Sequence, residues 1–567
     1  MTFRNEVSIV LAGEAGQGLQ SIETMVAAIA KKAGFHVFAT KEYMSRVRGG
    51  SNSTELRIAS HPVSAYVDRI DVLLPLTKAG LDHVRERIGP STLVIGEAAL
   101  LGEPKMVDVP FSSLASGIGA SLYANTIAVG LLTSMLGLGP AEGESLIAAF
   151  FEKKGEGVAQ KNIQAFRVGH AKGLEHASQL TLSLRPDPGV QDRIMVNGAE
   201  AISLGALAGG CNYVCAYPMS PGTSVLTTLA EYSKTFDLVV EQVEDEIGVA
   251  NMALGAWYAG ARALVTTSGG GFALMGEAVS LSGGIETPLV VHLAQRPGPA
   301  TGLPTRTEQA DLDLAIHAGH GDFLRIVLAP GDLAEGFSLG RKAFELADRW
   351  QSPVVLLSDQ YFVDSYYTTP AFDPGQGPPE QELVLPSKDY QRYRLGSPDG
   401  LSPRGLPGKG QGLVSVDSDE HDESGHITEE KGLRKAMVEK RLAKLTAVQR
   451  DMIEPSFFGP KDGKTLIVSW GSTKAVILEA LEALGQQGHK GLSFLHYSWV
   501  FPLPVDTRSR LLGYSRIIVV EGNATGQFAN LLEATTGLRL GERILKYDGY
   551  QFSVEEFVDR IGGIHGR

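Results

Sequence analysis

The sequence predicts an α/β protein with three α/β domains and one extended linker. Its 567 residues are too many for one core, because single hydrophobic cores stop growing at roughly 250–300 residues. Apolar strand-like runs alternate with helical stretches in three separate blocks, which is the pattern of sheets covered by helices. We therefore expect domains at residues 1–182, 190–365 and 465–567, with residues 366–464 forming a linker that holds one helix.

The first block opens with a strand, a glycine turn and a helix. Val7 to Ala12 are apolar, the turn from Gly13 to Gly18 follows, and a helix is expected from Leu19 to Ala33. This order begins a β-α-β unit. Further strands are expected at residues 72–76 and 91–95, with a helix at 124–136 and a proline-containing connection at 184–189.

The second block repeats the alternation and predicts a parallel, doubly wound sheet. Its first strand is expected at residues 193–198, and its helices include residues 247–259 and 332–348. Further strands are expected at residues 212–217, 263–267, 288–292 and 354–358.

The linker and the third block differ in composition. Proline, glycine and charged residues dominate the linker, apart from a helix expected at residues 429–452. That helix is expected to be amphipathic, and its apolar residues Leu433, Met437, Leu442 and Leu445 lie roughly on one face. The third block returns to alternation, with a helix at 474–484 and strands at 465–471, 492–496, 516–521 and near 544–547.

Charge and cysteine content narrow the classes of function. The net charge of −13 disfavours nucleic-acid binding, which needs clustered Lys and Arg. Cys211 and Cys215 are too few for an iron–sulfur cluster and lack the spacing of a redox pair. Both are interpreted as ordinary buried thiols in a reducing compartment. Because neither a signal core nor a membrane-length apolar run is present, we expect a cytoplasmic protein with no membrane span.

Two segments of the first block have the composition of anion-binding sites. The spacing of Gly13, Gly16 and Gly18 is off-register for a dinucleotide fingerprint. It fits either an anion at a helix N-terminus or a tight structural turn. The segment from Lys41 to Asn52 combines cations, glycines and hydroxyls. It suits a carboxylate or a phosphate, and a solvated charged loop is the alternative.

Four segments of the second block follow strands, at the edge where open α/β sheets bind ligands. Tyr217–Ser224 places three hydroxyls at a helix N-terminus, more than N-capping requires. The acids of Glu241–Glu246 either favour the helix dipole or reach a cofactor nitrogen. Glycines in Thr266–Phe272 let a ligand approach the backbone closely, and Arg296–Arg306 offers two arginines for a substrate carboxylate.

The linker segment Asp417–His426 is dense in carboxylates and imidazoles. Its register is not that of an EF-hand calcium loop. A solvated acidic turn is the favoured interpretation, and metal binding is the alternative.

Together and in this order, these motifs resemble the 2-oxoacid:ferredoxin oxidoreductases. More narrowly, the chain is similar to the alpha subunit of the type that carries a fused gamma domain in front. Residues 1–180 look like the gamma domain, and residues 190–365 look like the pyrimidine-binding domain of thiamine-diphosphate enzymes. Residues 465–567 resemble a transketolase C-terminal domain, through Val520-Glu-Gly-Asn523 and Gly526-Gln527.

The resemblance implies cofactor contacts. Glu246 falls at the place of the glutamate that contacts the aminopyrimidine of thiamine diphosphate, and this is the catalytic role that we expect for it. Tyr217, Pro218 and Gly270 are expected to line the same cofactor.

The resemblance also implies substrate contacts. Ser220, Thr223 and Arg306 look like the group that holds the 1-carboxylate of a 2-oxoacid. Arg48 and Ser51 are expected to reach the far end of the substrate or coenzyme A.

Two absences from the sequence imply a partner. No Gly-Asp-Gly motif for magnesium and diphosphate is present, and the cysteines cannot hold a cluster. The resemblance therefore implies a separate beta subunit with Mg²⁺ and a [4Fe-4S] cluster, an α2β2 assembly, ferredoxin as electron acceptor and coenzyme A as acyl acceptor.

The resemblance favours 2-oxoglutarate as the substrate, in oxidative decarboxylation or the reverse carboxylation. Lys41, Arg46 and Arg48 are candidates for its second carboxylate. Pyruvate and branched-chain 2-oxoacids are alternatives. Two rival classes are a nicotinamide dehydrogenase, which the glycine spacing disfavours, and a non-catalytic scaffold, which Glu246 and Arg306 disfavour.

Overall fold

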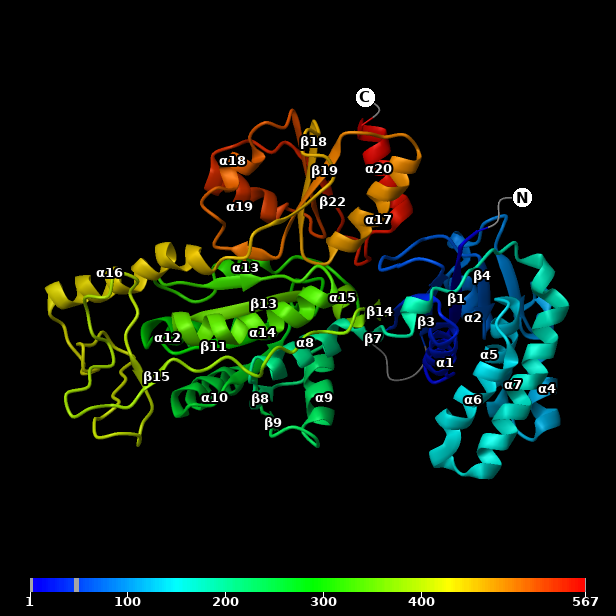
Figure 1. The fold of residues 1–567 in the computed structure, drawn as a ribbon, viewed down its shortest axis with the longest axis horizontal. Coiled ribbons are helices and arrows are strands. Elements are labelled where there is room, and N and C mark those ends of the chain that lie inside the picture. Colours follow the sequence, from blue (N-terminus) through cyan, green and yellow to red (C-terminus); the bar gives the residue numbers. More distant parts are fainter. Residues whose placement is uncertain (1–3, 45–49, 104, 566–567) are drawn as a thin grey trace. The chain divides into compact units, whose positions relative to one another are not determined.

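The computed structural model describes residues 4–44, 50–103 and 105–565. It divides into two compact units. The first comprises Met1–Val196, Asp364–Ala371 and Ser553–Asp559, and the second comprises Asn197–Val363, Phe372–Phe552 and Arg560–Arg567. Three large sheets with helices between their strands confirm the α/β class (Figure 1).

The first unit is built on an eight-stranded mixed sheet with the order β6-β5-β4-β1-β3-β2-β14-β7. Its strands are β1 (Glu6–Glu14), β2 (His36–Glu42), β3 (Ser51–Ala59), β4 (Val72–Pro75), β5 (Leu93–Gly96), β6 (Val107–Asp108), β7 (Ile194–Asn197) and β14 (Tyr366–Thr369). Its helices are α1 (Leu19–Lys32), α2 (Lys78–His83), α3 (Ala98–Leu101), α4 (Phe111–Ile118), α5 (Ala124–Met135), α6 (Pro140–Phe151) and α7 (Glu156–His176).

Two features of this sheet differ from the sequence prediction. β2 and β3 form an antiparallel pair, so the basic segment expected as a loop is the connection between two strands. β3 was hidden because it carries the buried charges of Glu55 and Arg57, which pair with Arg87 and Glu6. The strand β7, expected to open the second domain, instead joins this sheet.

The second unit begins with a seven-stranded sheet of order β20-β12-β13-β11-β10-β8-β9. Neighbouring strands of this sheet are parallel, except that β20 runs antiparallel to β12. The strands are β8 (Tyr213–Ala216), β9 (Val239–Gln242), β10 (Ala263–Thr267), β11 (Leu289–Gln295), β12 (Ile326–Leu328), β13 (Pro353–Asp359) and β20 (Trp499–Phe501). The helices are α8 (Gly198–Ala208), α9 (Thr223–Tyr232), α10 (Glu246–Ala259), α11 (Gly269–Leu274), α12 (Gly276–Gly284), α13 (Leu312–Ile316), α14 (Leu333–Trp350) and α15 (Gln360–Asp364).

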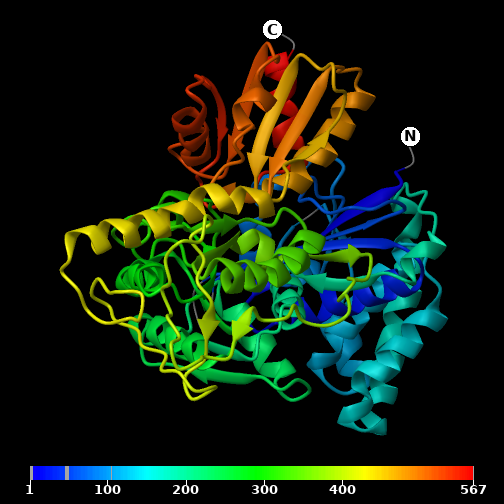
Figure 2. The same cartoon turned by 60° about the vertical axis from the view of Figure 1, so that its left-hand side comes forward.

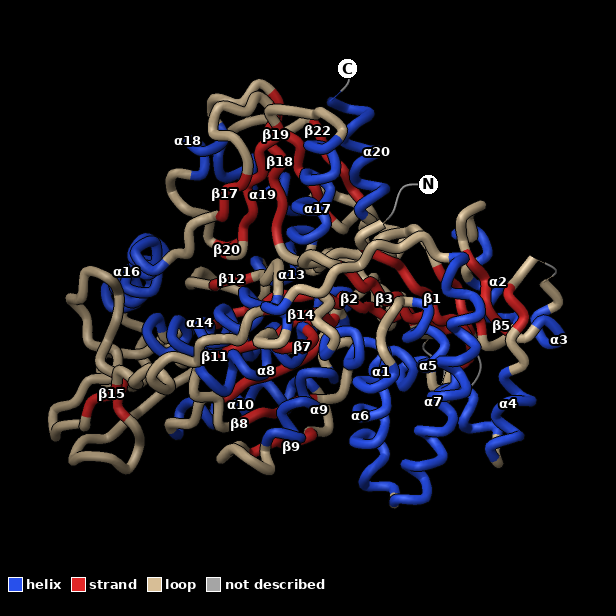
Figure 3. The backbone as a smooth tube through the Cα atoms, turned by 45° about the vertical axis from the view of Figure 1, so that its right-hand side comes forward, coloured by secondary structure: helices blue, strands red, loops and turns tan. Residues whose placement is uncertain are grey.

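A five-stranded sheet of order β17-β19-β18-β21-β22 completes the second unit (Figure 3). Its strands are β17 (Ser456–Phe458), β18 (Thr465–Trp470), β19 (Leu492–Tyr497), β21 (Arg516–Glu521) and β22 (Glu542–Leu545). Its helices are α17 (Thr473–Gln486), α18 (Thr507–Leu511) and α19 (Gln527–Thr536), and the last helix of the chain is α20 (Val554–His565). One hydrophobic cluster includes Trp470 and Phe528 of this layer together with Leu328 and Val355 of the seven-stranded sheet. The two sheets therefore share a core.

The linker is ordered rather than loose, and runs along the helices of the seven-stranded sheet (Figure 2). It contains the short parallel pair β15 (Leu383–Val384) and β16 (Arg404–Gly405) and the helix α16 (Lys431–Ala447). The sequence correctly predicted this helix, but its buried face was predicted wrongly. Met437 is buried as expected, while its neighbours on the buried face are Lys440, Arg441 and Lys444.

A cluster of charged side chains, which we call the lysine clamp, explains that face. It consists of Glu286, Lys440, Lys444 and Arg392, all buried. Lys440 Nζ donates to both carboxylate oxygens of Glu286 at 2.5 and 2.6 Å, and Lys444 Nζ lies 2.7 Å from Oε2. Arg392 donates to the backbone oxygen of Glu286 at 2.5 Å. The clamp therefore holds the linker to the end of α12.

In the described part of the chain, no single helix is long and apolar enough to cross a membrane. The bent pair of residues 111–118 and 121–135 meets the length and composition criteria only jointly.

Candidate active site

The carboxyl ends of β8, β9, β10 and β11 bring four segments to one edge of the seven-stranded sheet. These are residues 217–222, 243–246, 268–271 and 296–311. Strands that run parallel in an open sheet present their carboxyl ends as the usual ligand-binding edge. The segments that the sequence selected in the second block therefore converge in space.

Glu246 is the first residue of α10, and its neighbour rather than Glu246 itself caps the helix. Asp245 accepts a hydrogen bond from Gly248 N at 2.7 Å. Glu246 is 4% exposed, and its Oε1 is buried without a partner among the described residues. A capping role is thus already filled by Asp245. The carboxylate of Glu246 is left available for a ligand.

Two glycines of the segment after β10 make room for carboxylates. A Cβ atom at Gly271 would lie 2.7 Å from Glu246 Oε1, and one at Gly269 would lie 2.5 Å from both oxygens of Asp311. Gly270 differs, because it is exposed and its nearest neighbour, Ala300 O, is 3.9 Å from an added Cβ. Of the three glycines, Gly270 is therefore the one that leaves bare backbone accessible.

The structure brings Arg296, and not Arg306, to Ser220. Arg296 Nη1 donates to the backbone oxygen of Ser220 at 2.6 Å, and burial lowers the pKa of this guanidinium. Arg306 lies over the ring of Tyr550, 5.1 Å from its centroid. Sequence reasoning offered both arginines of this segment for the carboxylate and chose Arg306. The available signal was that Arg296 directly follows the last residue of β11.

The remaining predicted residues of this edge are also placed. Thr223 is the first residue of α9, and its backbone N donates to Met219 O at 3.1 Å. Tyr217 and Pro218 are exposed. Three further apolar side chains of α10 and α11 are exposed, namely Ile247, Met252 and Leu274. These side chains leave exposed apolar area on α10 and α11, the two helices that begin at the site.

Four buried polar atoms in this region have no partner within the described residues. They are Glu246 Oε1, Ser268 Oγ, Arg296 Nε and Asp311 Oδ2, and we call these four residues the cradle. A buried polar group left without a hydrogen bond costs roughly 1–3 kcal/mol, so such groups are rare unless they meet a ligand, water or partner. The cradle offers two acceptors, one cation and one hydroxyl. This set fits a ligand that carries both ring N–H or amino donors and a carboxylate.

The predicted residues of the first unit lie in a different part of the molecule's fold. Ser51 opens β3, and its Oγ donates to Ala79 O at 3.2 Å. Lys41, at the end of β2, forms an ion pair of 3.3 Å with Asp364. Arg46 and Arg48 lie outside the described residues.

The glycine turn of the first unit is closed by its own contacts. Gln17 Oε1 accepts from Glu14 N at 2.8 Å, and a Cβ at Gly13 would lie 2.6 Å from that oxygen. Gly18 has a φ of 83° at the N-cap of α1, a backbone conformation that glycine adopts without strain. These contacts favour the tight structural turn over the anion site.

The acidic linker segment satisfies its carboxylates with its own neighbours. Burial alone raises the pKa of Glu420, but Arg441 and Arg434 outweigh it and lower the pKa to about 2. Asp422 accepts from the backbone N of Ser424 and of His426. Among the described residues, no group of three or more His, Cys, Asp or Glu side chains is placed to hold a metal ion. The structure therefore favours the acidic turn.

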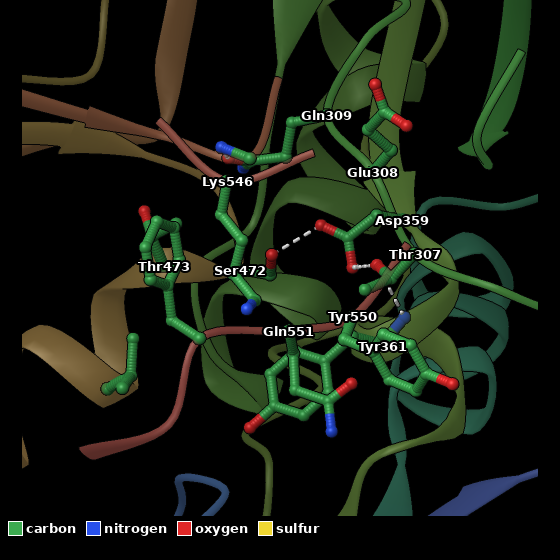
Figure 4. A pocket seen from close by; sticks show the side chains of 13 residues that line it. Thr307, Glu308, Gln309, Asp359, Tyr361, Ser472, Thr473, Lys546, Tyr550 and Gln551 are labelled. Carbon is green, nitrogen blue, oxygen red and sulfur yellow. Dashed lines mark hydrogen bonds between the residues drawn. The ribbon is translucent and has the colours of Figure 1, made fainter. Parts of the chain in front are cut away.

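A separate small cavity lies between the two sheets of the second unit (Figure 4). Asp359 lies at its centre and accepts hydrogen bonds from Ser472 and from Thr307 Oγ1, the latter at 3.3 Å. Burial raises the pKa of Asp359. The space that it offers to the centre of a water molecule is about 30 Å³.

Family models match most of the chain. The model described as "Pyruvate flavodoxin/ferredoxin oxidoreductase, thiamine diP-bdg" matches residues 204–440, and "Pyruvate ferredoxin/flavodoxin oxidoreductase" matches residues 8–172. The first match contains the whole cradle. The chain is therefore an oxidoreductase with a thiamine-diphosphate-binding domain.

Full-length relatives define the family more narrowly. The alpha subunit of 2-oxoacid:ferredoxin oxidoreductase 2 from Aeropyrum pernix is 32% identical, with 98% of each chain covered. The 2-oxoglutarate oxidoreductase subunit KorA of Mycobacterium tuberculosis is 29% identical, over 97% of this chain and 90% of that one. A solved 2-oxoglutarate:ferredoxin oxidoreductase from Magnetococcus marinus superposes with a TM-score of 0.93 at 29% identity, covering 99% of this chain and 100% of that chain. The chain belongs to the family of 2-oxoacid:ferredoxin oxidoreductase alpha subunits.

Proposed function

We propose that the chain is the alpha subunit of an enzyme that converts 2-oxoglutarate and coenzyme A to an acyl-CoA and CO₂, or catalyses the reverse carboxylation. The observation that supports 2-oxoglutarate as the substrate is the full-length likeness to the Magnetococcus marinus enzyme. That enzyme's structure was solved with 2-oxoglutarate, coenzyme A and succinyl-CoA bound. Relatives named KorA support the same substrate. Pyruvate and branched-chain 2-oxoacids are the alternatives.

The cradle supports this chemistry through its unpartnered groups. Thiamine diphosphate, when bound, supplies the carbon nucleophile and the electron sink that decarboxylation of a 2-oxoacid needs. Glu246 is proposed to hold a proton between its Oε1 and the pyrimidine ring, in the role that a positioned carboxyl performs in general acid–base catalysis. Tyr217, Pro218 and Gly270 are proposed to line the ring.

Arg296 joins Ser220 and Thr223 in the proposed carboxylate site. A guanidinium offers a fork of donors that matches a carboxylate, and Arg296 is already fixed to the Ser220 backbone at 2.6 Å. Arg306 stays a prediction from the sequence for the same role. Arg48 and Ser51 stay predictions for the far end of the substrate or for coenzyme A.

A partner subunit is part of this proposal. The sequence lacks a Gly-Asp-Gly motif and has two cysteines, so Mg²⁺ and a [4Fe-4S] cluster are assigned to a beta subunit in an α2β2 assembly that reduces ferredoxin in the cytoplasm. Ile247 and Leu274 expose 53% and 54% of their surface at the edge of the site. Contiguous exposed apolar side chains mark interaction surfaces, and this one is proposed to receive the beta subunit.

The test is anaerobic, coenzyme A-dependent reduction of a viologen dye by the chain assembled with its beta subunit, thiamine diphosphate and Mg²⁺. The wild type is expected to use 2-oxoglutarate in preference to pyruvate and a branched 2-oxoacid. Glu246→Gln is expected to reduce kcat about 100- to 10,000-fold, the usual contribution of general acid–base catalysis.

Glu244→Gln is the matched control, because Glu244 is exposed and two residues away. It is expected to keep full activity. Preference for another 2-oxoacid would change the substrate and keep the class, whereas a cluster-loaded complex that uses none of the three would refute the proposal.

A further inference from the structure

Asp311 carries a buried carboxylate oxygen, Oδ2, that sequence reasoning did not select, and its side chain does not cap the helix as its position predicts. It stands at the N-cap of α13, yet its side chain makes no capping hydrogen bond. An Asp at this position usually accepts from a helix N–H, a contact that contributes about 1 kcal/mol. Its carboxyl group instead lies against Gly269, within 2.5 Å of where a Cβ would stand.

The backbone of Asp311 is held in this place from two strands. Asp311 N donates to Gln295 Oε1 at 3.0 Å, and Gln295 Nε2 donates to the Ser358 backbone oxygen at 3.1 Å. Gln295 ends β11, and Ser358 belongs to β13. The carboxylate is therefore fixed by the sheet rather than by a mobile loop.

Two groups of opposite charge stay unpaired beside each other here. Asp311 Oδ2 and Arg296 Nε are both buried without a partner in the described part of the chain. The two charges nevertheless act on each other, since Arg296 lowers the pKa of Asp311 while burial, the larger effect, raises it to about 6. Because no hydrogen bond joins these two groups in the described part of the chain, Asp311 Oδ2 stays able to accept from a third group.

We propose that Asp311 is a further residue of the active site, whose buried Oδ2 accepts a hydrogen bond from an N–H or O–H donor of the bound cofactor or substrate. Arg296 then takes the carboxylate of the 2-oxoacid. This inference rests on the proposed function for the identity of the ligand. It extends that function by a residue located 65 positions after Glu246 in the sequence.

The experiment compares Asp311→Leu and Asp311→Asn with wild type in the assembled complex. Leu removes both the charge and the acceptor at similar size, and Asn removes the charge alone. Asp313→Asn is the matched control, because Asp313 is exposed on the same short helix. Calorimetric titration with thiamine diphosphate and Mg²⁺ gives the Kd of the cofactor, and dye reduction gives KM and kcat for the 2-oxoacid.

Two outcomes support the proposal and separate the possible donors. A 10- to 100-fold rise in the Kd of thiamine diphosphate in Asp311→Leu, about the contribution of a hydrogen bond to a charged group, places the donor on the cofactor. An unchanged Kd with a rise of the same size in KM for the 2-oxoacid places it on the substrate. Values of Kd, KM and kcat that all match wild type would overturn the proposal.

A measurement without ligand tests whether Asp311 is the strained carboxylate that the geometry describes. Its folded pKa of about 6 exceeds the unfolded value of about 3.9, so its ionisation destabilises the fold, fully so above pH 6. The gain in Tm of Asp311→Asn over wild type is therefore expected to be small at pH 4 and larger at pH 8. The charged groups acting on Asp311 are Arg296 and Glu308, and both are kept in this comparison.

A failure of the proposed function can be distinguished from a failure of the role proposed for Asp311. If the proposed function is wrong, the wild-type complex shows no 2-oxoacid-dependent dye reduction, and the cofactor titration still decides the role of Asp311. If Asp311→Leu does not assemble, Asp311→Ala, which also removes the acceptor, decides by the same Kd and KM.

Discussion

The lysine clamp and the cradle both bury charge in the second unit, but only the clamp pairs it. Both carboxylate oxygens of Glu286 bind lysine Nζ atoms at 2.5 to 2.7 Å. In the cradle, one oxygen each of Glu246 and Asp311 has no partner among the described residues. Buried charges that serve only the fold are paired. The carboxylates of Glu246 and Asp311 therefore differ from that of Glu286 in being open to a ligand.

The largest effect is expected on the free energy of unfolding, from a substitution that breaks the clamp. Glu286→Gln leaves Lys440 and Lys444 buried without a counter-ion, and removing one partner of a buried pair costs about 3–5 kcal/mol. Urea unfolding of the full chain at pH 7 measures it. Glu277→Gln on α12, the helix that ends just before Glu286, is the control, because its ion pair with His320 is exposed, and its effect is expected within about 0.5 kcal/mol. Equal effects of the two would show that the clamp is not structural.

The next effect separates the two arginines of the site. Arg296→Ala is expected to raise KM for the 2-oxoacid about 10- to 100-fold, because it removes a charged hydrogen-bond donor next to Ser220. Arg306→Ala is expected to change KM less, because Arg306 lies over Tyr550. Steady-state kinetics of the assembled complex compares them. The reverse order would restore the choice that the sequence favoured.

A smaller effect of pH tests the pairing within the clamp. Burial raises the pKa of Glu286, but Lys444, Lys440 and Arg392 outweigh it and hold the pKa well below its usual range. A folded pKa below the unfolded value of about 4.3 contributes stability above that pH, and the contribution is lost as pH falls. The advantage of wild type over Glu286→Gln in urea is expected to be full at pH 7 and smaller at pH 3.5. A constant advantage would contradict the pairing.

The smallest effect is expected on the Tm of a variant of the unpaired carboxylate Glu246. Glu246→Gln is expected to leave the Tm unchanged or slightly raised, because it replaces a buried carboxylate with a neutral amide of the same shape and breaks no bond that Glu246 Oε1 makes. A scanning calorimeter measures the full chain at pH 7. A Tm loss as large as that of Glu286→Gln would place Glu246 with the structural charges.

The fold was predictable wherever a strand is a continuous apolar run. The strands beginning at Ala263 and Thr465 and the helix beginning at Leu19 start where the sequence places them. The pairing of β14 with β2 could not be predicted, because Tyr367 and Phe38 are more than 300 residues apart. The buried face of α16 could not be predicted either. Lysines are almost never buried unless paired, and the partner of these lysines, Glu286, lies in another part of the sequence.

The sequence predicted which segments form the site, but it did not predict all of the side chains that those segments contribute. Glu246 and Ser220 follow strands, and the motifs around them are local in sequence. The choice between Arg296 and Arg306 depends on where the nine intervening residues turn, which no local pattern gives. Asp311 was missed because its partner surface, Gly269, is 42 residues away and its position at a helix start looks like ordinary capping.

The unpaired atoms of the cradle have a consequence for directed evolution. A selection that rewards survival after heating favours apolar or neutral replacements at Asp311 and Glu246, since each removes a carboxylate with a buried oxygen that has no partner among the described residues. Such a selection would enrich robust but inactive proteins. Libraries screened for thermotolerance should therefore keep positions 246, 296 and 311 fixed and vary the linker surface instead.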